Sequence, residues 1–292
     1  MLEDKRSFIT RNLEVRVSVG YEHPPGCVIA YLKYVYTGRG LWRGFERVIP
    51  SYDPLSVRKG NLVYDPNFSS EVPCVDATEV LWAPHPLKRM GEVIASPKDE
   101  LEGLALDAYS NLGIKQLGLG GSLLLSIHHD NSDLDFLIYP VGDPMWIWEE
   151  LESSEVLEEE KGWIWRVSKS LGIPLEDAKS LYSKAKRAVY RNKEVSFAFV
   201  KEELERYGNS VSEFVGRFEG TLELEPCERG LYYPHRCWAG KYLIESYESA
   251  FAKVFVKGGK VRVRGALYEK PNGEKVIRVG VREERGYLLF GK

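Results

Sequence analysis

The sequence predicts an α+β protein in which a mixed β-sheet with helices lies between two β-rich regions. Alternation of apolar and polar residues, typical of strands, is concentrated near both ends of the chain. In the middle, apolar residues recur at helical spacing, and the run that opens with Asp133-Leu134-Asp135 continues as a buried strand. The 292 residues exceed one average domain. We therefore expect three units: β-rich residues 1–95, a core with a helical insert over 96–205, and β-rich residues 206–292.

The first region should contain a hairpin, because residues 13–19 and 28–36 are strand-like and 23–26 read His-Pro-Pro-Gly, a turn sequence. Residues 49–97 are dense in proline and polar side chains, so we expect them to wrap a neighbouring unit without a core of their own. Aromatic residues here are interleaved with Arg39, Arg43 and Arg47. Such a mixture can bind single-stranded nucleic acid, although a sheet core with arginines at its rim is the more frequent arrangement.

The central region should begin with a helix. Ser96 is a favoured N-cap, Pro97 suits the first turn, and Asp99 is acidic at the third position. Apolar residues recur through residue 112, and Gly113 supplies the stop. Residues 114–119 should then form a short strand.

That strand leads into Gly120-Gly121-Ser122. Two glycines allow a tight turn close to a ligand, and Ser122 would cap a short helix over 123–127. Unpaired N–H groups at a helix start attract phosphate, and the Ser122 hydroxyl could add a hydrogen bond. The turn is therefore a candidate phosphate site.

Asp133 and Asp135 should lie on one face of the next strand, while Leu134 and Phe136 enter the core. Their spacing is roughly 7 Å at about 3.3 Å per residue. Mg²⁺ prefers one or two carboxylates together with phosphate oxygens and water. The segment thus predicts a nucleoside triphosphate held by the turn, with its metal held by the two aspartates.

This order of helix, strand, Gly-Ser turn, short helix and Asp-x-Asp strand resembles the DNA polymerase β-like nucleotidyltransferase superfamily. The resemblance covers residues 96–200, about a third of the chain, and rests on Gly121, Ser122, Asp133 and Asp135. It implies a nucleotidyltransferase-type mixed sheet and transfer of a nucleotide from a triphosphate to an acceptor, with release of pyrophosphate. Asp133 and Asp135 would bind Mg²⁺ or Mn²⁺, and Gly120, Gly121 and Ser122 would contact the triphosphate.

The chain departs from that pattern after the serine. Many members of the superfamily carry Ala-Arg-Gly there, whereas this chain has Leu124-Leu125-Ser126, so a basic residue is missing. His128 and His129 could supply charge, or could equally be neutral loop histidines.

The superfamily places a third carboxylate on the next strand of the sheet, for which residues 194–200 are the candidate. Alternation puts Glu194 and Ser196 on one face, so Glu194 is the nominated third catalytic carboxylate. Serine at the middle position, where the superfamily has aspartate, can also mean that this carboxylate is absent. Glu223 or Glu225 is the fallback, although such a pair is more often the solvated face of an edge strand.

Two further stretches could meet a substrate. A predicted helix from 174 to about 190 carries five basic residues, Lys179, Lys184, Lys186, Arg187 and Arg191, although a solvated helix face is the commoner explanation. In the last region, residues 261–264 and 276–281 should pair across a Pro-Asn-Gly-Glu turn. Arg229, Arg236 and Lys241 flank a Tyr-Tyr-Pro-His run and are candidate contacts to an acceptor or a phosphate.

Composition sets the remaining expectations. The net charge of −3 means that nucleic-acid binding would need a local patch. No apolar run approaches about 18 residues, which favours the cytoplasm and no membrane partner. The four cysteines read as reduced, although Cys227 and Cys237 are close enough for a local bridge; with His235 they are one ligand short of a zinc site. A single glutamine, Gln116, with 28% charged residues suggests a thermophilic source.

The expected function is a metal-dependent nucleotidyltransferase whose acceptor is RNA or protein, since large flanking regions suit a large acceptor. A second hypothesis is a catalytically silent nucleotide- or RNA-binding module that retains the fold, and a third is a scaffold whose aspartates cap a turn. The sequence indicates neither the nucleotide preference nor the oligomeric state.

Overall fold

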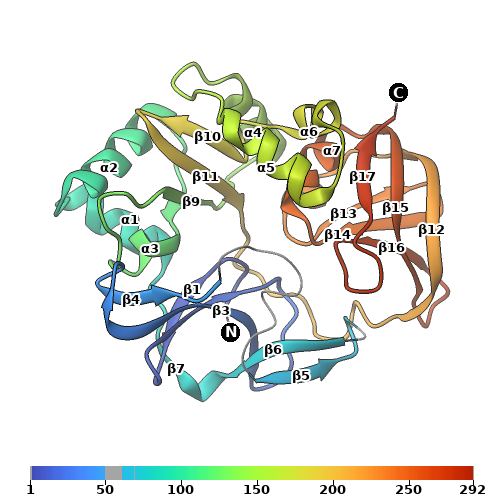
Figure 1. The fold of residues 1–292 in the computed structure, drawn as a ribbon, viewed down its shortest axis with the longest axis horizontal. Coiled ribbons are helices and arrows are strands. Elements are labelled where there is room, and N and C mark those ends of the chain that lie inside the picture. Colours follow the sequence, from blue (N-terminus) through green and yellow to red (C-terminus); the bar gives the residue numbers. More distant parts are fainter. Residues whose placement is uncertain (1, 50–60, 69, 292) are drawn as a thin grey trace.

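The computed structural model describes residues 2–49, 61–68 and 70–291, whose strands form three β-sheets. In Figure 1 the N-terminal sheet lies at the bottom, the central sheet and most helices lie above it, and the C-terminal sheet lies to the right. The predicted α+β class, with β-rich regions flanking a central mixed sheet, is therefore confirmed.

The N-terminal sheet has the strand order β5-β6-β3-β2-β1-β7 within the described ranges, and β4 pairs with β3. Its strands are β1 Ser7–Thr10, β2 Glu14–Ser18, β3 Cys27–Gly40, β4 Gly44–Arg47, β5 Leu62–Asp65, β6 Ser70–Asp76 and β7 Val80–Trp82, with the 3-10 turn η1 Ala77–Glu79 before β7. The predicted hairpin is present as the antiparallel pair β2 and β3.

Where it is described, the segment 49–97 has no core separate from that of the preceding strands, because its own strands join the same sheet. Strand β6 pairs with β3 and β7 pairs with β1, and Val72 and Val75 are buried. β-branched residues pack well on a pleated surface, which explains why this proline-containing segment still joins the sheet. Part of the segment, residues 50–60 and 69, lies outside the described residues.

The central sheet has the order β10-β11-β9-β8, with β9 and β11 parallel and the other pairs antiparallel. Its elements are α1 Pro86–Ala95, α2 Glu100–Leu112, β8 Leu117–Leu119, α3 Gly121–Leu124, β9 Leu134–Ile138, α4 Pro144–Ser153, α5 Lys161–Leu171, α6 Leu175–Leu181, β10 Arg187–Tyr190 and β11 Lys193–Phe199. The predicted strand pair that carries the aspartates and Glu194 is thus present in one sheet.

The first predicted helix of this region begins later than expected. Asp99 is its N-cap and accepts a hydrogen bond from the Glu102 amide at 3.0 Å, while Ser96 follows the preceding helix α1. An aspartate caps at least as well as a serine, so the Ser96 assignment is wrong. The predicted stop is confirmed, because Gly113 adopts the left-handed conformation with φ 66°.

The helix predicted over residues 174–190 is wrong in its second half. Helix α6 ends at Leu181, and Arg187–Tyr190 forms strand β10, which pairs with β11. Arg191 and Asn192 form the connecting turn with φ 45° and 65°. A two-residue turn of this kind needs positive φ at both positions, and Arg-Asn lacks the glycine that would have indicated it.

Helices cover one face of the central sheet and leave the other for the site. Phe136 and Phe197 face Met90 of α1 and Trp148 of α4 in one buried cluster. Trp148 is fully buried. Burying a large apolar side chain stabilises the fold by about 1.5–3 kcal/mol. Because side chains alternate along a strand, Asp135 and Ser196 lie on the opposite face.

The C-terminal sheet has the order β12-β15-β16-β14-β13, with β17 also paired to β15. Its elements are β12 Glu213–Leu224, η2 Glu228–Leu231, β13 His235–Ala239, β14 Tyr242–Ser246, η3 Ser249–Phe251, α7 Ala252–Lys257, β15 Gly259–Glu269, β16 Lys275–Val279 and β17 Tyr287–Phe290. A hairpin is present at the predicted turn, with Gly273 at φ 83°, but its pairing differs from the prediction. Strand β16 pairs with Ala266–Glu269, whereas residues 261–264 pair with β17 and β12.

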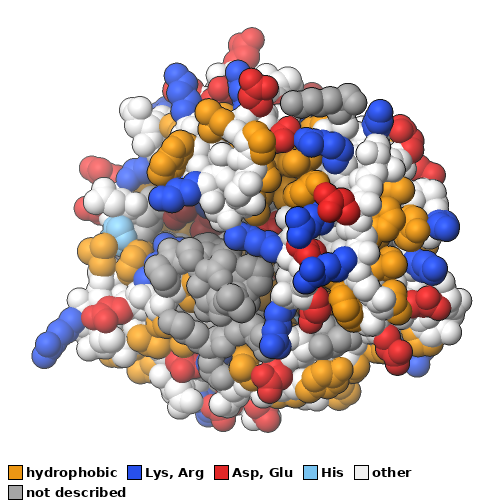
Figure 2. All heavy atoms as spheres, turned by 45° about the vertical axis from the view of Figure 1, so that its right-hand side comes forward, with side chains coloured by type: hydrophobic (Ala, Val, Ile, Leu, Met, Phe, Trp, Pro, Cys, Tyr) orange, Lys and Arg blue, Asp and Glu red, His pale blue; other side chains and the backbone are white. Residues whose placement is uncertain are grey.

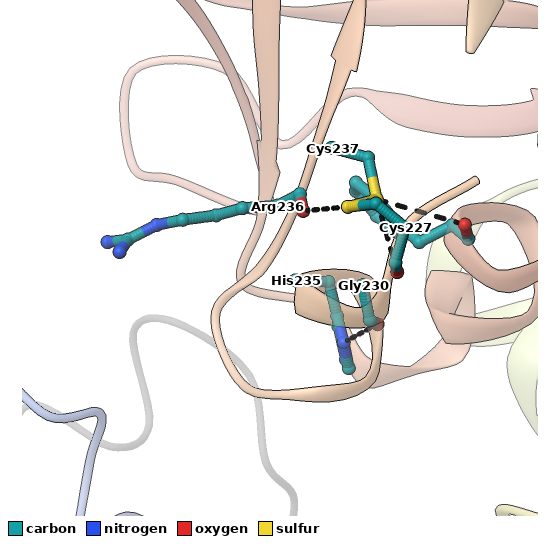
Figure 3. The surroundings of a disulfide bond; sticks show 6 residues. Cys227, Gly230, His235, Arg236 and Cys237 are labelled. Carbon is teal, nitrogen blue, oxygen red and sulfur yellow. Dashed lines mark hydrogen bonds between the residues drawn. A yellow bond between two sulfur atoms is a disulfide. The ribbon is translucent and has the colours of Figure 1, made fainter. Parts of the chain in front are cut away.

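The cysteines are paired, which corrects the expectation that they are reduced. Cys27 of β3 bonds to Cys74 of β6, and Cys227 bonds to Cys237 of β13, with Cα atoms 6.0 and 5.9 Å apart. Neighbouring strands bring the first pair within bridging distance. Figure 3 shows the second pair, with the Arg236 side chain pointing away from it and the His235 ring bonded to the Gly230 carbonyl oxygen at 2.7 Å. A zinc site at Cys227, Cys237 and His235 is therefore not supported.

Polar contacts join the N-terminal sheet to the other two. The Tyr139 hydroxyl, just beyond β9, donates to a carboxylate oxygen of Glu3 at 2.8 Å. Arg236 of the C-terminal sheet lies 3.6 Å from Glu22. Among the described residues, each helix is too short or too polar to cross a membrane.

Candidate nucleotide and metal site

Asp135 lies at one end of a row of side chains that crosses three strands. In the sheet register, Asp135 of β9 is paired with Ser196 of β11, which is paired with Arg187 of β10. The Ser196 hydroxyl donates a hydrogen bond to Oδ1 of Asp135. Ser196 stands where a third carboxylate was considered, and it instead fixes the orientation of the second one.

The glycine turn contacts the same aspartate from the other side. The Gly120 amide donates to the Asp135 carbonyl oxygen at 2.7 Å. A Cβ atom at Gly121 would lie 3.0 Å from Cγ of Asp135 and closer still to its Oδ2, and Gly121 has φ 54°. Gly121 therefore lacks a side chain for two reasons, its left-handed backbone and the adjacent carboxylate.

The role predicted for Ser122 as a helix cap is wrong. Helix α3 starts at Gly121, its N-cap is Gly120, and Ser122 is its buried second residue. Glycine can serve as an N-cap without a side-chain hydrogen bond. The helix therefore begins one residue before Ser122, and Ser122 lies inside it. The first N–H groups of α3 still lack intrahelical acceptors, and they start directly beside Asp135.

Asp133 precedes β9 and completes the pair. Its Oδ2 lies 3.6 Å from Nη1 of Arg187, which also lies 4.0 Å from Oε2 of Glu194. The side chains of Asp133 and Glu194 are 43% and 50% exposed. Asp133 and Glu194 thus share one arginine, and the charge of the same arginine acts on Asp135.

The two aspartates have pKa values shifted in opposite directions. The charge of Asp135, followed by burial, raises the pKa of Asp133, against the opposing effect of Arg187 and Lys33. Burial also raises the pKa of Asp135, but Lys33, Arg187 and the Ser196 hydrogen bond together hold it below its usual value. Two carboxylates that repel each other in this way favour a bound cation between them.

The N-terminal sheet supplies part of the positive charge. Lys33 of β3 and Arg47 of β4 both lower the pKa of Asp135. These strands are held beside the site because Tyr34 and Phe45 pack against Leu125 and Ile127 after α3. The basic residue missing after the serine is therefore matched by cations from distant parts of the chain. The sequence analysis did not single out Lys33, since nothing local marks it.

The fallback carboxylates lie elsewhere. Glu223 belongs to β12 and Glu225 follows it, at the edge of the C-terminal sheet. That edge position is the solvated arrangement expected as their commoner role, so Glu194 is the third candidate that shares a sheet with Asp135.

His128 and His129 contact groups other than the aspartate pair. His128 Nε2 lies 2.8 Å from Oδ2 of Asp99, and the His129 ring packs edge-on against Trp42. Asp99, Glu102 and His128 are close enough to hold a metal ion. However, the Glu102 oxygens are bonded to Arg89 and to the Lys98 amide. This group is therefore better explained as the start of α2 than as a metal site.

No protein-family model, curated protein or solved structure matches the chain. The functional interpretation therefore depends on the motif and on the geometry around Asp135.

Proposed function

We propose that this protein is a metal-dependent nucleotidyltransferase that moves a nucleotide from a nucleoside triphosphate to an acceptor and releases pyrophosphate. The observation that carries the proposal is the contact between Gly121 and Asp135, which joins the candidate phosphate turn to the candidate metal ligands. A glycine turn alone, or an Asp-x-Asp pair alone, is common. A turn in which the glycine leaves no room for a side chain beside the aspartate carboxylate is a more specific arrangement.

The residues fit Mg²⁺ or Mn²⁺. Asp133 and Asp135 would hold the ion, because they are adjacent, partly accessible and mutually repulsive. When bound, the ion neutralises charge on the phosphates and activates the attacking oxygen. The N–H groups at Gly121 and Ser122 would bind phosphate oxygens, and Lys33 and Arg187 would offset the remaining negative charge.

In the proposed reaction, an acceptor oxygen forms a bond to the α-phosphorus while the bond to the β-phosphate oxygen breaks. Pyrophosphate leaves with that electron pair. Glu194, which lies 4.0 Å from Nη1 of Arg187, is the residue that we assign as the acceptor of the hydroxyl proton. Ser196 acts by positioning Asp135.

The acceptor that we propose is RNA or a protein side chain, and the location is the cytoplasm of a thermophilic cell. Two disulfides are compatible with this, since intracellular proteins of hyperthermophiles are often rich in them. No membrane partner is proposed.

Turnover tests this proposal. Each of four α-³²P-labelled nucleoside triphosphates is incubated with the protein, Mg²⁺ and a pool of short RNAs, and label transfer to RNA or to the protein itself is measured with pyrophosphate release. We expect transfer that is lost in Asp133→Asn and Asp135→Asn and kept in Asp130→Asn, the same change at an exposed residue of the preceding loop. Equal transfer by the first two variants would overturn the proposal.

A silent nucleotide-binding module is the second candidate, favoured by the serine at position 196. That residue gives the metal pair a hydrogen-bond donor in place of a third ligand on β11. Since positioning and electrostatics dominate phosphoryl transfer, losing one carboxylate can leave binding intact without turnover. Metal-dependent triphosphate binding with no transfer to any acceptor would favour this candidate.

A further inference from the structure

A cavity of about 340 Å³ lies where the central sheet meets the C-terminal sheet. Four cationic residues line it, Lys201, Arg229, Arg236 and Lys270, with one carboxylate, Glu205. Its volume is at the lower end of the range for small-ligand sites. The residues come from distant segments: Lys201 follows β11, Arg229 lies in η2 and Arg236 in β13. Two of the three residues flanking the Tyr-Tyr-Pro-His run therefore converge here, whereas Lys241 packs over Tyr242.

Glu205 acts as an internal counterion in this cavity. Its carboxylate oxygens lie 2.9 Å from Lys201 Nζ, 2.8 Å from Arg229 Nη2 and 2.9 Å from Arg236 Nη1. Burial raises its pKa, but the Lys201 hydrogen bond and the charges of Arg236, Lys201 and Arg229 together lower it. One ionised carboxylate is thus shared by three cations.

Not all of the positive charge is neutralised. Arg236 also pairs with Glu22 and with the buried Glu245, which Arg278 shares, and Lys270 lies 2.5 Å from Glu274. This network therefore holds five cations and four carboxylates, an excess of one positive charge. A guanidinium has five N–H groups. Of the three nitrogens of the Arg229 guanidinium, only Nη2 donates a hydrogen bond to an acceptor among the described residues. Its side chain is 61% exposed, so its remaining donors can reach a ligand.

We infer that this cavity binds a phosphodiester group of a single-stranded RNA acceptor. This assignment rests on the proposed function, because it makes the cavity the acceptor side of the same reaction. One phosphodiester carries one negative charge, which matches the accessible excess. Asn209 lines the same cavity and offers a side-chain amide. A protein hydroxyl acceptor would need no such anion site.

The position of the cavity suits a strand that reaches the aspartates. Lys201 lies five residues beyond Ser196, roughly 16 Å at about 3.3 Å per residue of strand. About five stacked nucleotides span that distance at 3.4 Å per step. Figure 2 shows Lys and Arg side chains gathered near the middle of the face that includes the C-terminal sheet, with single acidic side chains among them.

The test is fluorescence anisotropy with a labelled ten-nucleotide RNA, without divalent metal or triphosphate. Arg229→Ala should weaken binding about tenfold and reduce the slope of log affinity against log salt by about one. Arg217→Ala removes an arginine of β12 that is at least as exposed as Arg229 and lies outside the cavity, and it should change affinity less than about twofold. Glu205→Gln removes the internal counterion and should strengthen binding, with thermal melting confirming that this variant is folded.

Equal affinity of Arg229→Ala and the unchanged protein, or equal weakening by Arg217→Ala, would overturn the inference. Displacement of the probe by pyrophosphate or a phosphoserine peptide at lower concentration than unlabelled RNA would overturn the assignment to RNA. Because this assay uses neither metal nor triphosphate, its failure is distinguishable from failure of the triphosphate site.

Discussion

The Asp135 carboxylate fills the space that a side chain at Gly121 would need: a methyl group at Gly121 would lie 3.0 Å from Cγ of Asp135 and closer to its Oδ2. The glycine turn and the Asp-x-Asp strand are therefore one structural unit, because the turn can approach the carboxylate only without a side chain. This relationship gives the proposed site its first test.

Gly121→Ala should disturb the site beyond its effect on the backbone. Alanine in a left-handed conformation costs about 1–2 kcal/mol, and here the methyl group also displaces the Asp135 carboxylate. We expect metal-dependent triphosphate binding to weaken at least about tenfold, as measured by calorimetry, since one tenfold step corresponds to 1.4 kcal/mol.

Gly113→Ala is the matched control. Gly113 has φ 66°, but an added Cβ atom would meet nothing within 4 Å. Gly121→Ala should therefore lose at least as much stability as Gly113→Ala in urea denaturation, and only Gly121→Ala should lose binding. Comparable loss of binding in both would show that the Asp135 contact is irrelevant.

Asp133→Asn should stabilise the metal-free protein at neutral pH. The folded-state pKa of Asp133 is raised, chiefly by the charge of Asp135. A carboxyl group whose pKa is raised on folding reduces stability as the pH rises above its unfolded value of about 3.9. Because the side chain is 43% exposed, solvent screening limits the gain to about 0.5 kcal/mol.

The check is the free energy of unfolding in urea, with EDTA, at pH 7 and pH 4. The gain should shrink as the pH falls, because the native carboxyl then becomes protonated and its repulsion by Asp135 is lost. Asp130→Asn should change stability little at either pH. If Asp133→Asn destabilises the metal-free protein at pH 7, the assignment of Asp133 as a repelled carboxylate fails.

Arg187→Gln should weaken triphosphate binding about tenfold. Arg187 is the cation between Asp133 and Glu194, and a charge-assisted hydrogen bond to phosphate contributes about 1.5–3 kcal/mol. Arg191→Gln alters an exposed arginine of the adjacent turn, which pairs with Asp107, and should leave binding unchanged. Unchanged binding in Arg187→Gln would remove this residue from the site.

The disulfides should account for a measurable share of the stability. In the chain-entropy account, closing loops of 47 and 10 residues stabilises by about 4 and about 3 kcal/mol. Cys27→Ala/Cys74→Ala should therefore cost more than Cys227→Ala/Cys237→Ala in urea denaturation. Mass spectrometry after alkylation of the denatured, unreduced protein should find no modified cysteine; modification of all four would contradict the pairing.

The sequence was most informative where the signal is local. Alternation placed Asp135 on a strand opposite the core face, with Asp133 just before that strand, and the proline-glycine turns located hairpins in both flanking sheets. Strand β10 was missed because Arg191 and Asn192 adopt positive φ without a glycine, so its basic residues looked helical. Cys27 and Cys74 are 47 residues apart in the sequence, and only the pairing of β3 with β6 brings them together.

The positive charge around the aspartates could not be predicted from the sequence either, because the residues that carry it are distant from the aspartates along the chain. Lys33 acts on Asp135 from a strand about a hundred positions earlier, positioned by the packing of Tyr34 and Phe45 on Ile127. Nothing near Lys33 distinguishes it from other strand lysines, so only the fold could bring it into the site.

The most direct test of the central claim is calorimetric titration of ATP, GTP, CTP and UTP, with and without Mg²⁺, into the unchanged protein and Asp133→Asn/Asp135→Asn. We predict binding of at least one triphosphate that requires both the metal and the aspartates. Binding that is independent of the metal, or absent for all four nucleotides, would contradict the triphosphate site.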